Sequence, residues 1–120
     1  EVIYQKQGIS VLPSDRKFYL EEMHSGKLML SYLDELLSVP RTKEELGKFY
    51  GGRIWFGEAD LAGLITDEYI SRMKIDNEEF DFTQDLAYGL IAISPVSSNG
   101  NHYIREICET FNQLSDLAAR

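Results

Sequence analysis

Apolar residues spaced three and four positions apart dominate the pattern of this chain. The most regular stripe begins at Asn101 and consists of Ile104, Ile107, Cys108, Phe111 and Leu114. A second stripe occupies residues 27–38 and consists of Met29, Leu30, Leu33, Leu36 and Leu37. Because an α-helix turns once in about 3.6 residues, this spacing gives each segment one apolar side. We therefore predict helices over 27–38 and from residue 101 toward the C-terminus.

Capping residues predict two more helices and their limits. Ser14 is a suitable N-cap for a helix over about 14–24. Val39-Pro40 closes the helix over 27–38, because the residue before a proline disfavours the helical backbone. Thr42, with Glu45 three positions later, forms a capping box for a short helix that Gly51-Gly52 ends.

The remaining segments of the first two thirds have less regular patterns. Residues 2–12 fit a short β-hairpin with Gly8 in the turn. Residues 53–56 fit an extended crossing or a buried connector. Residues 61–73 contain enough apolar side chains for helical pieces with a break near Thr66, and 76–81 is predicted to be a loop.

Two interpretations fit the segment that follows Thr83. It can be a helix carrying Leu86, Ala87, Leu90 and Ile91, or residues 90–94 can be a buried strand before Pro95. Residues 97–100 are predicted to form a turn. The pattern as a whole predicts one domain over residues 1–120, mainly α, built as a compact bundle of five or six helices with a possible short N-terminal β-hairpin.

Composition adds limits on compartment and ligands. The chain has 120 residues, 43% of them apolar, and a net charge of −8. Such acidity argues against a nucleic-acid partner, and no apolar run approaches the roughly 20 residues that span a membrane. Cys108 is the only cysteine, so it cannot form an internal disulfide. We expect a cytoplasmic protein.

The acidic charge is concentrated in one quarter of the chain. Residues 1–55 contain eight acidic and eight basic residues, whereas residues 56–85 contain nine acidic residues against Arg72 and Lys74, a net charge of −7. A run of charge is usually a solvated surface. Here it is interleaved with aromatic residues, which protein interfaces favour.

Sequence signatures of common active sites are missing. The nine glycines do not have the spacing of a phosphate-binding loop. His24 and His102 are too far apart in sequence to indicate a zinc motif, and residues 76–81 lack the glycine of a calcium loop. Cys108 lies in an apolar stripe and is expected in the core. We therefore predict a protein without enzymatic activity, cofactor or metal.

The acidic segment also supplies the predicted partner-binding site. Tyr69, Phe80 and Phe82 are flanked by acidic residues and are expected to be partly exposed anchors, whereas Trp55 and Phe56 are expected in the core. The predicted site consists of Glu58, Asp60, Asp67, Glu68, Tyr69, Asp76, Glu78, Glu79, Phe80, Asp81, Phe82 and Asp85.

The chain resembles the small acidic immunity proteins with which bacteria neutralise their own toxins, including those of contact-dependent growth inhibition and colicin systems. The resemblance rests on chain length, on the lack of catalytic signatures and on the acidic block 76–85. It implies a monomer that binds a basic toxin domain, expected to be a nuclease, one to one through the acidic surface, with no nucleic acid or membrane as partner.

Two other functions remain open from the sequence. The first is a small helical regulator or adaptor that self-associates through its C-terminal helix, with the acidic residues serving solubility. The second is a hydrolase that uses a carboxylate pair such as Glu58 with Asp60, or Glu78 with Asp85. A hydrolase of this kind needs one carboxyl group whose pKa is raised.

Overall fold

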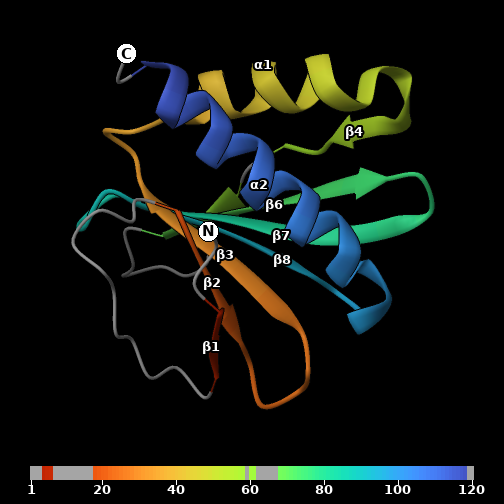
Figure 1. The fold of residues 1–120 in the computed structure, drawn as a ribbon. Coiled ribbons are helices and arrows are strands. Elements are labelled where there is room, and N and C mark those ends of the chain that lie inside the picture. Colours follow the sequence, from red (N-terminus) through yellow and green to blue (C-terminus); the bar gives the residue numbers. More distant parts are fainter. Residues whose placement is uncertain (1–3, 7–17, 59, 62–67, 119–120) are drawn as a thin grey trace.

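A large β-sheet with two α-helices on one side is the architecture of this protein (Figure 1). The structure is a computed structural model that describes residues 4–6, 18–58, 60–61 and 68–118. These residues form eight strands: β1 (Tyr4–Lys6), β2 (Tyr19–Glu22), β3 (Leu28–Leu33), β4 (Ile54–Phe56), β5 (Asp60–Leu61), β6 (Glu68–Ile75), β7 (Glu78–Asp85) and β8 (Leu90–Pro95). The helices are α1 (Val39–Tyr50), α2 (Asn101–Ala118) and the short 3-10 helices η1 (Gly51–Arg53) and η2 (Ser98–Gly100).

The prediction of a mainly α bundle is therefore wrong. The strand order is β1-β2-β3-β8-β7-β6-β4, and β5 also pairs with β6. Every pairing from β2 to β4 in this order is antiparallel, whereas β1 pairs with β2 in parallel. Of the predicted N-terminal hairpin, the structure describes residues 4–6, which form β1 and pair with β2; residues 7–12 lie outside the described residues.

A two-residue alternation of buried and exposed side chains explains the strands. In β7, Phe80 and Phe82 are buried and Asp81 between them is not. In β3, Leu28, Leu30 and Tyr32 are buried, and these residues lie in the segment predicted as the helix over 27–38. That segment has apolar residues at both spacings, and the pairing of β3 with β2 and β8 decides for the strand.

Several predicted boundaries change for the same reason. The helix over 14–24 is wrong where it is described, because 19–22 is β2; its predicted cap Ser14 lies outside the described residues. In the described part of the predicted helical pieces over 61–73, Leu61 belongs to β5 and the residues from Glu68 onward form β6, whose partner β7 begins within the predicted loop 76–81. The predicted break near Thr66 lies outside the described residues. Of the two interpretations after Thr83, the buried strand is confirmed as β8.

Helix α1 begins where the sequence predicted a helix end. Ser38 is its N-cap, and the Ser38 hydroxyl accepts a hydrogen bond from the Arg41 N–H at 3.3 Å. Pro40 fits the first turn, where its missing N–H costs no helical hydrogen bond. Thr42, predicted as the cap, is a buried residue inside the helix. The predicted end at Gly51 is confirmed.

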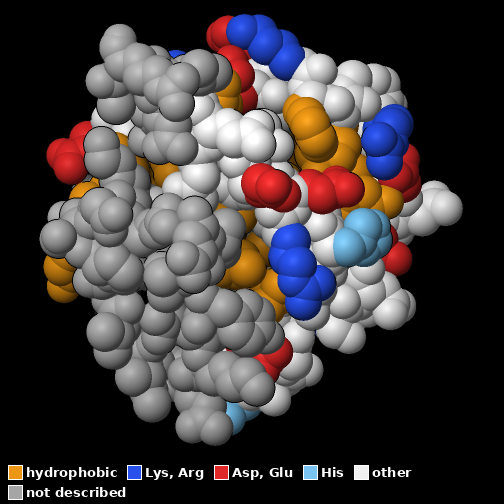
Figure 2. Space-filling view, viewed as in Figure 1, with side chains coloured by type: hydrophobic (Ala, Val, Ile, Leu, Met, Phe, Trp, Pro, Cys, Tyr) orange, Lys and Arg blue, Asp and Glu red, His pale blue; other side chains and the backbone are white. Residues whose placement is uncertain are grey.

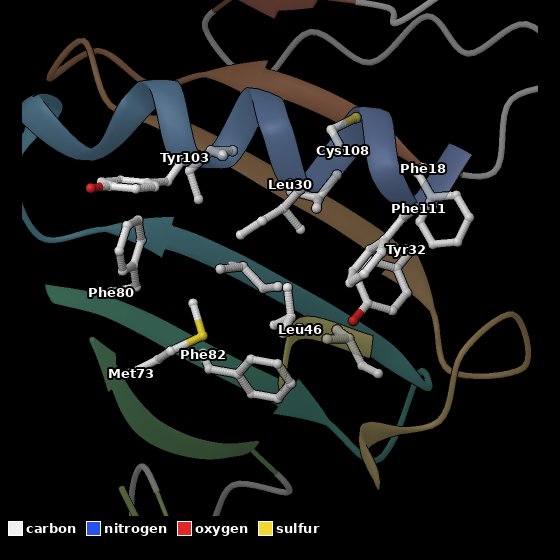
Figure 3. Packing of buried hydrophobic residues seen from close by; sticks show 14 of the residues in the cluster. Phe18, Leu30, Tyr32, Leu46, Met73, Phe80, Phe82, Tyr103, Cys108 and Phe111 are labelled. Carbon is white, nitrogen blue, oxygen red and sulfur yellow. The ribbon is translucent and has the colours of Figure 1, made fainter. Parts of the chain in front are cut away.

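Helix α2 covers the sheet and confirms the C-terminal helix. Its buried residues Ile104, Ile107, Cys108 and Phe111 pack against β3 and β8, which lie at the centre of the sheet (Figure 3). The rings of Phe18, Tyr32 and Phe111 meet with centroids 5.1 to 5.7 Å apart. The exposed side of α2 bears carboxylates, a basic residue and a histidine (Figure 2). None of the helices among the described residues is long and apolar enough to cross a membrane.

Candidate protein-binding surface

The β6–β7 hairpin gathers charged side chains on the face of the sheet opposite the helices. Arg72 pairs in register with Asp81, and Lys74 pairs with Glu79. Because partners in an antiparallel ladder point to the same side, these four residues share one face. Arg72 Nε lies 3.2 Å from Asp81 Oδ1, and Arg72 Nη1 lies 3.5 Å from Glu79 Oε1. One guanidinium thus serves two carboxylates, and with Lys74 on the same face these four side chains have no net charge, so the excess negative charge of the segment comes from its other acids.

The other predicted acids occupy several places around this hairpin. Glu58 is exposed just after β4, and Glu78 is half-buried at the start of β7. Asp85 ends β7 and pairs in register with Glu68. Asp67 and the side chains of Asp60 and Glu68 lie outside the described residues. Glu79, Asp81 and Asp85 occupy alternate positions of β7 and so share one face, and we call these three, together with the exposed Glu58 that follows β4, the acidic face.

Asp76 does not belong to the acidic face, because it holds the hairpin turn in place. Its Oδ1 accepts a hydrogen bond from Arg53 Nε at 2.9 Å, and its Oδ2 accepts from Arg53 Nη2 at 2.7 Å and from the Tyr103 hydroxyl at 2.6 Å. These hydrogen bonds, that from Arg53 first, lower the pKa of the Asp76 carboxyl well below its usual range. Asp76 stays ionised and is occupied by internal partners.

A second tyrosine–carboxylate pair lies next to that turn. The Tyr50 hydroxyl donates a hydrogen bond to Glu106 Oε1 at 3.0 Å, and Arg53 lies over the Tyr50 ring. Burial, followed by this hydrogen bond, raises the pKa of Tyr50. The arrangement ties α1, the hairpin turn and α2 together. The carboxyl group beside it that has a shifted pKa is that of Asp76, and its pKa is lowered, the opposite of what a general acid at neutral pH requires.

The aromatic anchors predicted from the sequence are mostly the wrong ones. Phe80 and Phe82 are 0% and 3% exposed, because the alternation of β7 points both rings toward the helices. Tyr69 is half-buried. Trp55, predicted in the core, is 55% exposed and pairs in register with Lys74, so it stands beside the acidic face. Tyr88 is 80% exposed in the turn between β7 and β8.

A strand pattern over residues 78–85 would have predicted the burial of Phe80 and Phe82 and the exposure of Tyr88. Phe80 and Phe82 alternate with polar residues, which is typical of a strand with one buried face. Once that strand is recognised, Asp85 and Gly89 mark a turn, and Tyr88 falls within it. Trp55 carried no comparable signal, since its exposure depends on which side of β4 faces the helices.

The remaining candidate chemistry is internal or incomplete. Cys108 is fully buried, which confirms the core prediction. Asn112 Nδ2 donates to the Cys108 carbonyl oxygen at 2.9 Å and lies 3.5 Å from its Sγ. Among the described residues, no three His, Cys, Asp or Glu side chains are grouped as metal ligands would be.

The apolar stripe of α2 is used by the core of this molecule. Ile104, Ile107 and Phe111 have no exposed surface. They are therefore unavailable for the self-association through the C-terminal helix that the sequence left open.

No protein-family model, curated protein or solved structure matches this chain.

Proposed function

We propose that this protein is an immunity-type inhibitor that binds a basic toxin domain, expected to be a nuclease, through its acidic face. One observation carries the proposal. The segment with a net charge of −7 contains the strands β5, β6 and β7, which are neighbours in the sheet, and its described carboxylates Glu79, Asp81 and Asp85 all lie on β7. The resemblance to acidic immunity proteins points to the same partner.

The acidic face supports inhibition by electrostatic competition. A nuclease binds the phosphates of its substrate with basic side chains. Carboxylates held along one strand can occupy such a cleft without being substrates for the enzyme. Their field also raises the rate of encounter with a positive surface, and this effect weakens as salt screens the charges. The protein acts as a monomer in the cytoplasm and needs no catalytic group of its own.

The test begins with capture from a native extract of the source cells at low salt. The immobilised wild-type protein is expected to recover a basic protein with nuclease activity, which is lost when the wild-type protein is added back. The association rate with this purified nuclease is then measured for a variant in which Glu58→Gln, Glu79→Gln and Asp81→Asn are combined. We expect association to slow by at least about tenfold at low salt.

The matched control removes the same charge from the helix side of the molecule. Glu44, Glu45 and Glu109 lie on α1 and α2, and their replacement by glutamine also raises the net charge by three. Asp76 is left unchanged in both variants, because its loss would disturb the hairpin turn. Equal association rates for the two variants would remove the acidic face as the binding surface.

A further inference from the structure

Three exposed apolar side chains lie on neighbouring segments at one end of the sheet. Leu86 and Tyr88, in the β7–β8 turn, are 52% and 80% exposed, and Leu33, at the end of β3, is 44% exposed. Leu33 pairs in register with Leu90, so the end of β3 lies beside this turn (Figure 1). We call Leu33, Leu86 and Tyr88 the apolar tip.

Hydrogen bonds fix the backbone beneath the apolar tip. Asp85 Oδ1 accepts from the N–H groups of Ala87 at 3.0 Å and Tyr88 at 3.3 Å. The Asp34 N–H donates to the Gly89 carbonyl oxygen at 2.6 Å, which ties the turn to the β3–α1 connection. Gly89 has a φ of 64°, a conformation that glycine adopts without strain. The turn is thus held in one shape, so little ordering is needed when a partner binds.

The surroundings of the apolar tip are acidic. Asp34 and Glu35 are the charged residues of the β3–α1 connection, and Asp85 is the charged residue at the base of the turn. Asp34 Oδ1 is shielded from water and has no hydrogen-bond partner among the described residues. An apolar centre with a carboxylate rim is complementary to an apolar pocket edged by lysine or arginine.

We infer that the apolar tip is the anchor of the partner complex: Leu86 and Tyr88 enter an apolar pocket with a basic rim on the toxin domain. This inference rests on the proposed function and adds a division of roles to it. The acidic face governs the association rate through its long-range field. The apolar tip governs the dissociation rate, because a preorganised tyrosine is a common hot spot of protein interfaces.

The experiment uses the nuclease recovered by the wild-type protein as its probe. In the tip variant, Leu86→Ala and Tyr88→Ala are combined. The matched control combines Phe49→Ala and Val96→Ala, since these side chains are 52% and 42% exposed on other elements. We expect the tip variant to dissociate at least about 30-fold faster than wild type, as for two interface hot spots. Its association rate and salt dependence should change by less than about threefold, and the control should behave as wild type.

Amide hydrogen exchange in the unaltered protein provides a second measurement. Binding of the nuclease should slow exchange at residues 86–90, whereas residues 47–50 of α1 should exchange as in the free protein. If the tip variant dissociates at the wild-type rate, or if exchange at residues 86–90 is unchanged on binding, the apolar tip is not the anchor. The proposed function would still stand if the variant of the acidic face associates slowly. Recovery of no basic nuclease by the wild-type protein would overturn both.

Discussion

A buried hydrogen bond between the hydroxyl groups of Tyr32 and Thr42 joins the sheet to α1 and allows a quantitative prediction. The two oxygens are 2.6 Å apart, and neither residue has exposed surface. In Tyr32→Phe the Thr42 hydroxyl loses this partner, and in Thr42→Val the Tyr32 hydroxyl does. Leaving a buried polar group unpaired costs about 1–3 kcal/mol, so each single variant should lose about that much free energy of unfolding.

The double variant separates the hydrogen bond from the packing. Combining Tyr32→Phe with Thr42→Val removes both polar groups and keeps both shapes, so its cost should be about 0–1 kcal/mol. The cost of the double variant should therefore be smaller than the sum of the single costs. Valine and threonine are both β-branched and have similar helix propensities, which keeps the comparison fair within α1.

Urea unfolding followed by far-ultraviolet circular dichroism and by Trp55 fluorescence measures the three variants. With a slope of about 2 kcal/mol per molar urea, a loss of 2 kcal/mol moves the midpoint by about 1 M. The comparison requires that the free energy of unfolding falls with urea concentration at the same slope in all variants. Additive costs would refute the reasoning, because they would mean that the two hydroxyls do not depend on each other.

Three further predictions concern acid stability, the replacement of two glycines and the burial of Cys108. Because hydrogen bonds lower the pKa of Asp76 in the folded protein, the ionised Asp76 contributes to folding stability above the ordinary Asp pKa of about 4, and this contribution is lost as pH falls below that value. Asp76→Asn should therefore flatten the fall of the urea midpoint in acid. Parallel plots of urea midpoint against pH for the two proteins would contradict this. Gly100→Ala should lower the free energy of unfolding by about 1–3 kcal/mol, since the added Cβ would lie 2.8 Å from Pro95 Cβ. Gly47→Ala in α1 meets open space and should raise the free energy of unfolding by about 0.5–1 kcal/mol. Urea midpoints measure both changes. The Cys108 thiol should react with a thiol reagent only as fast as the protein opens, and rapid modification of the native protein would count against its burial.

The candidate surface was partly predictable from the sequence. The concentration of charge in 56–85 is a property of the chain, and the acids Glu58, Glu79 and Asp81 were among the predicted residues. Which acids are available was not predictable, because Asp76 is occupied by Arg53 and by Tyr103, which is 27 positions away in sequence. Trp55 was missed because its exposure depends on which face of the sheet the helices cover, and Tyr88 was missed because the β7–β8 turn was not recognised.

The fold shows the same division between local and long-range causes. Helix α2 and the end of α1 were predicted because a one-sided apolar stripe and a glycine after the last turn act locally. Segment 27–38 had apolar residues at both helical and strand spacings, so its local pattern was ambiguous.

The sequence by itself determined the single cysteine, the position of the excess negative charge and the amphipathic C-terminal helix. Only the tertiary structure decided that β3 is a strand and that its end, with Leu33, lies beside the β7–β8 turn, with Leu86 and Tyr88. The reason is physical: a strand gains its hydrogen bonds and its buried face from neighbours that are distant in sequence. Residues 28–33 acquire their conformation from β2 and β8, and β8 lies about 60 residues further along the chain.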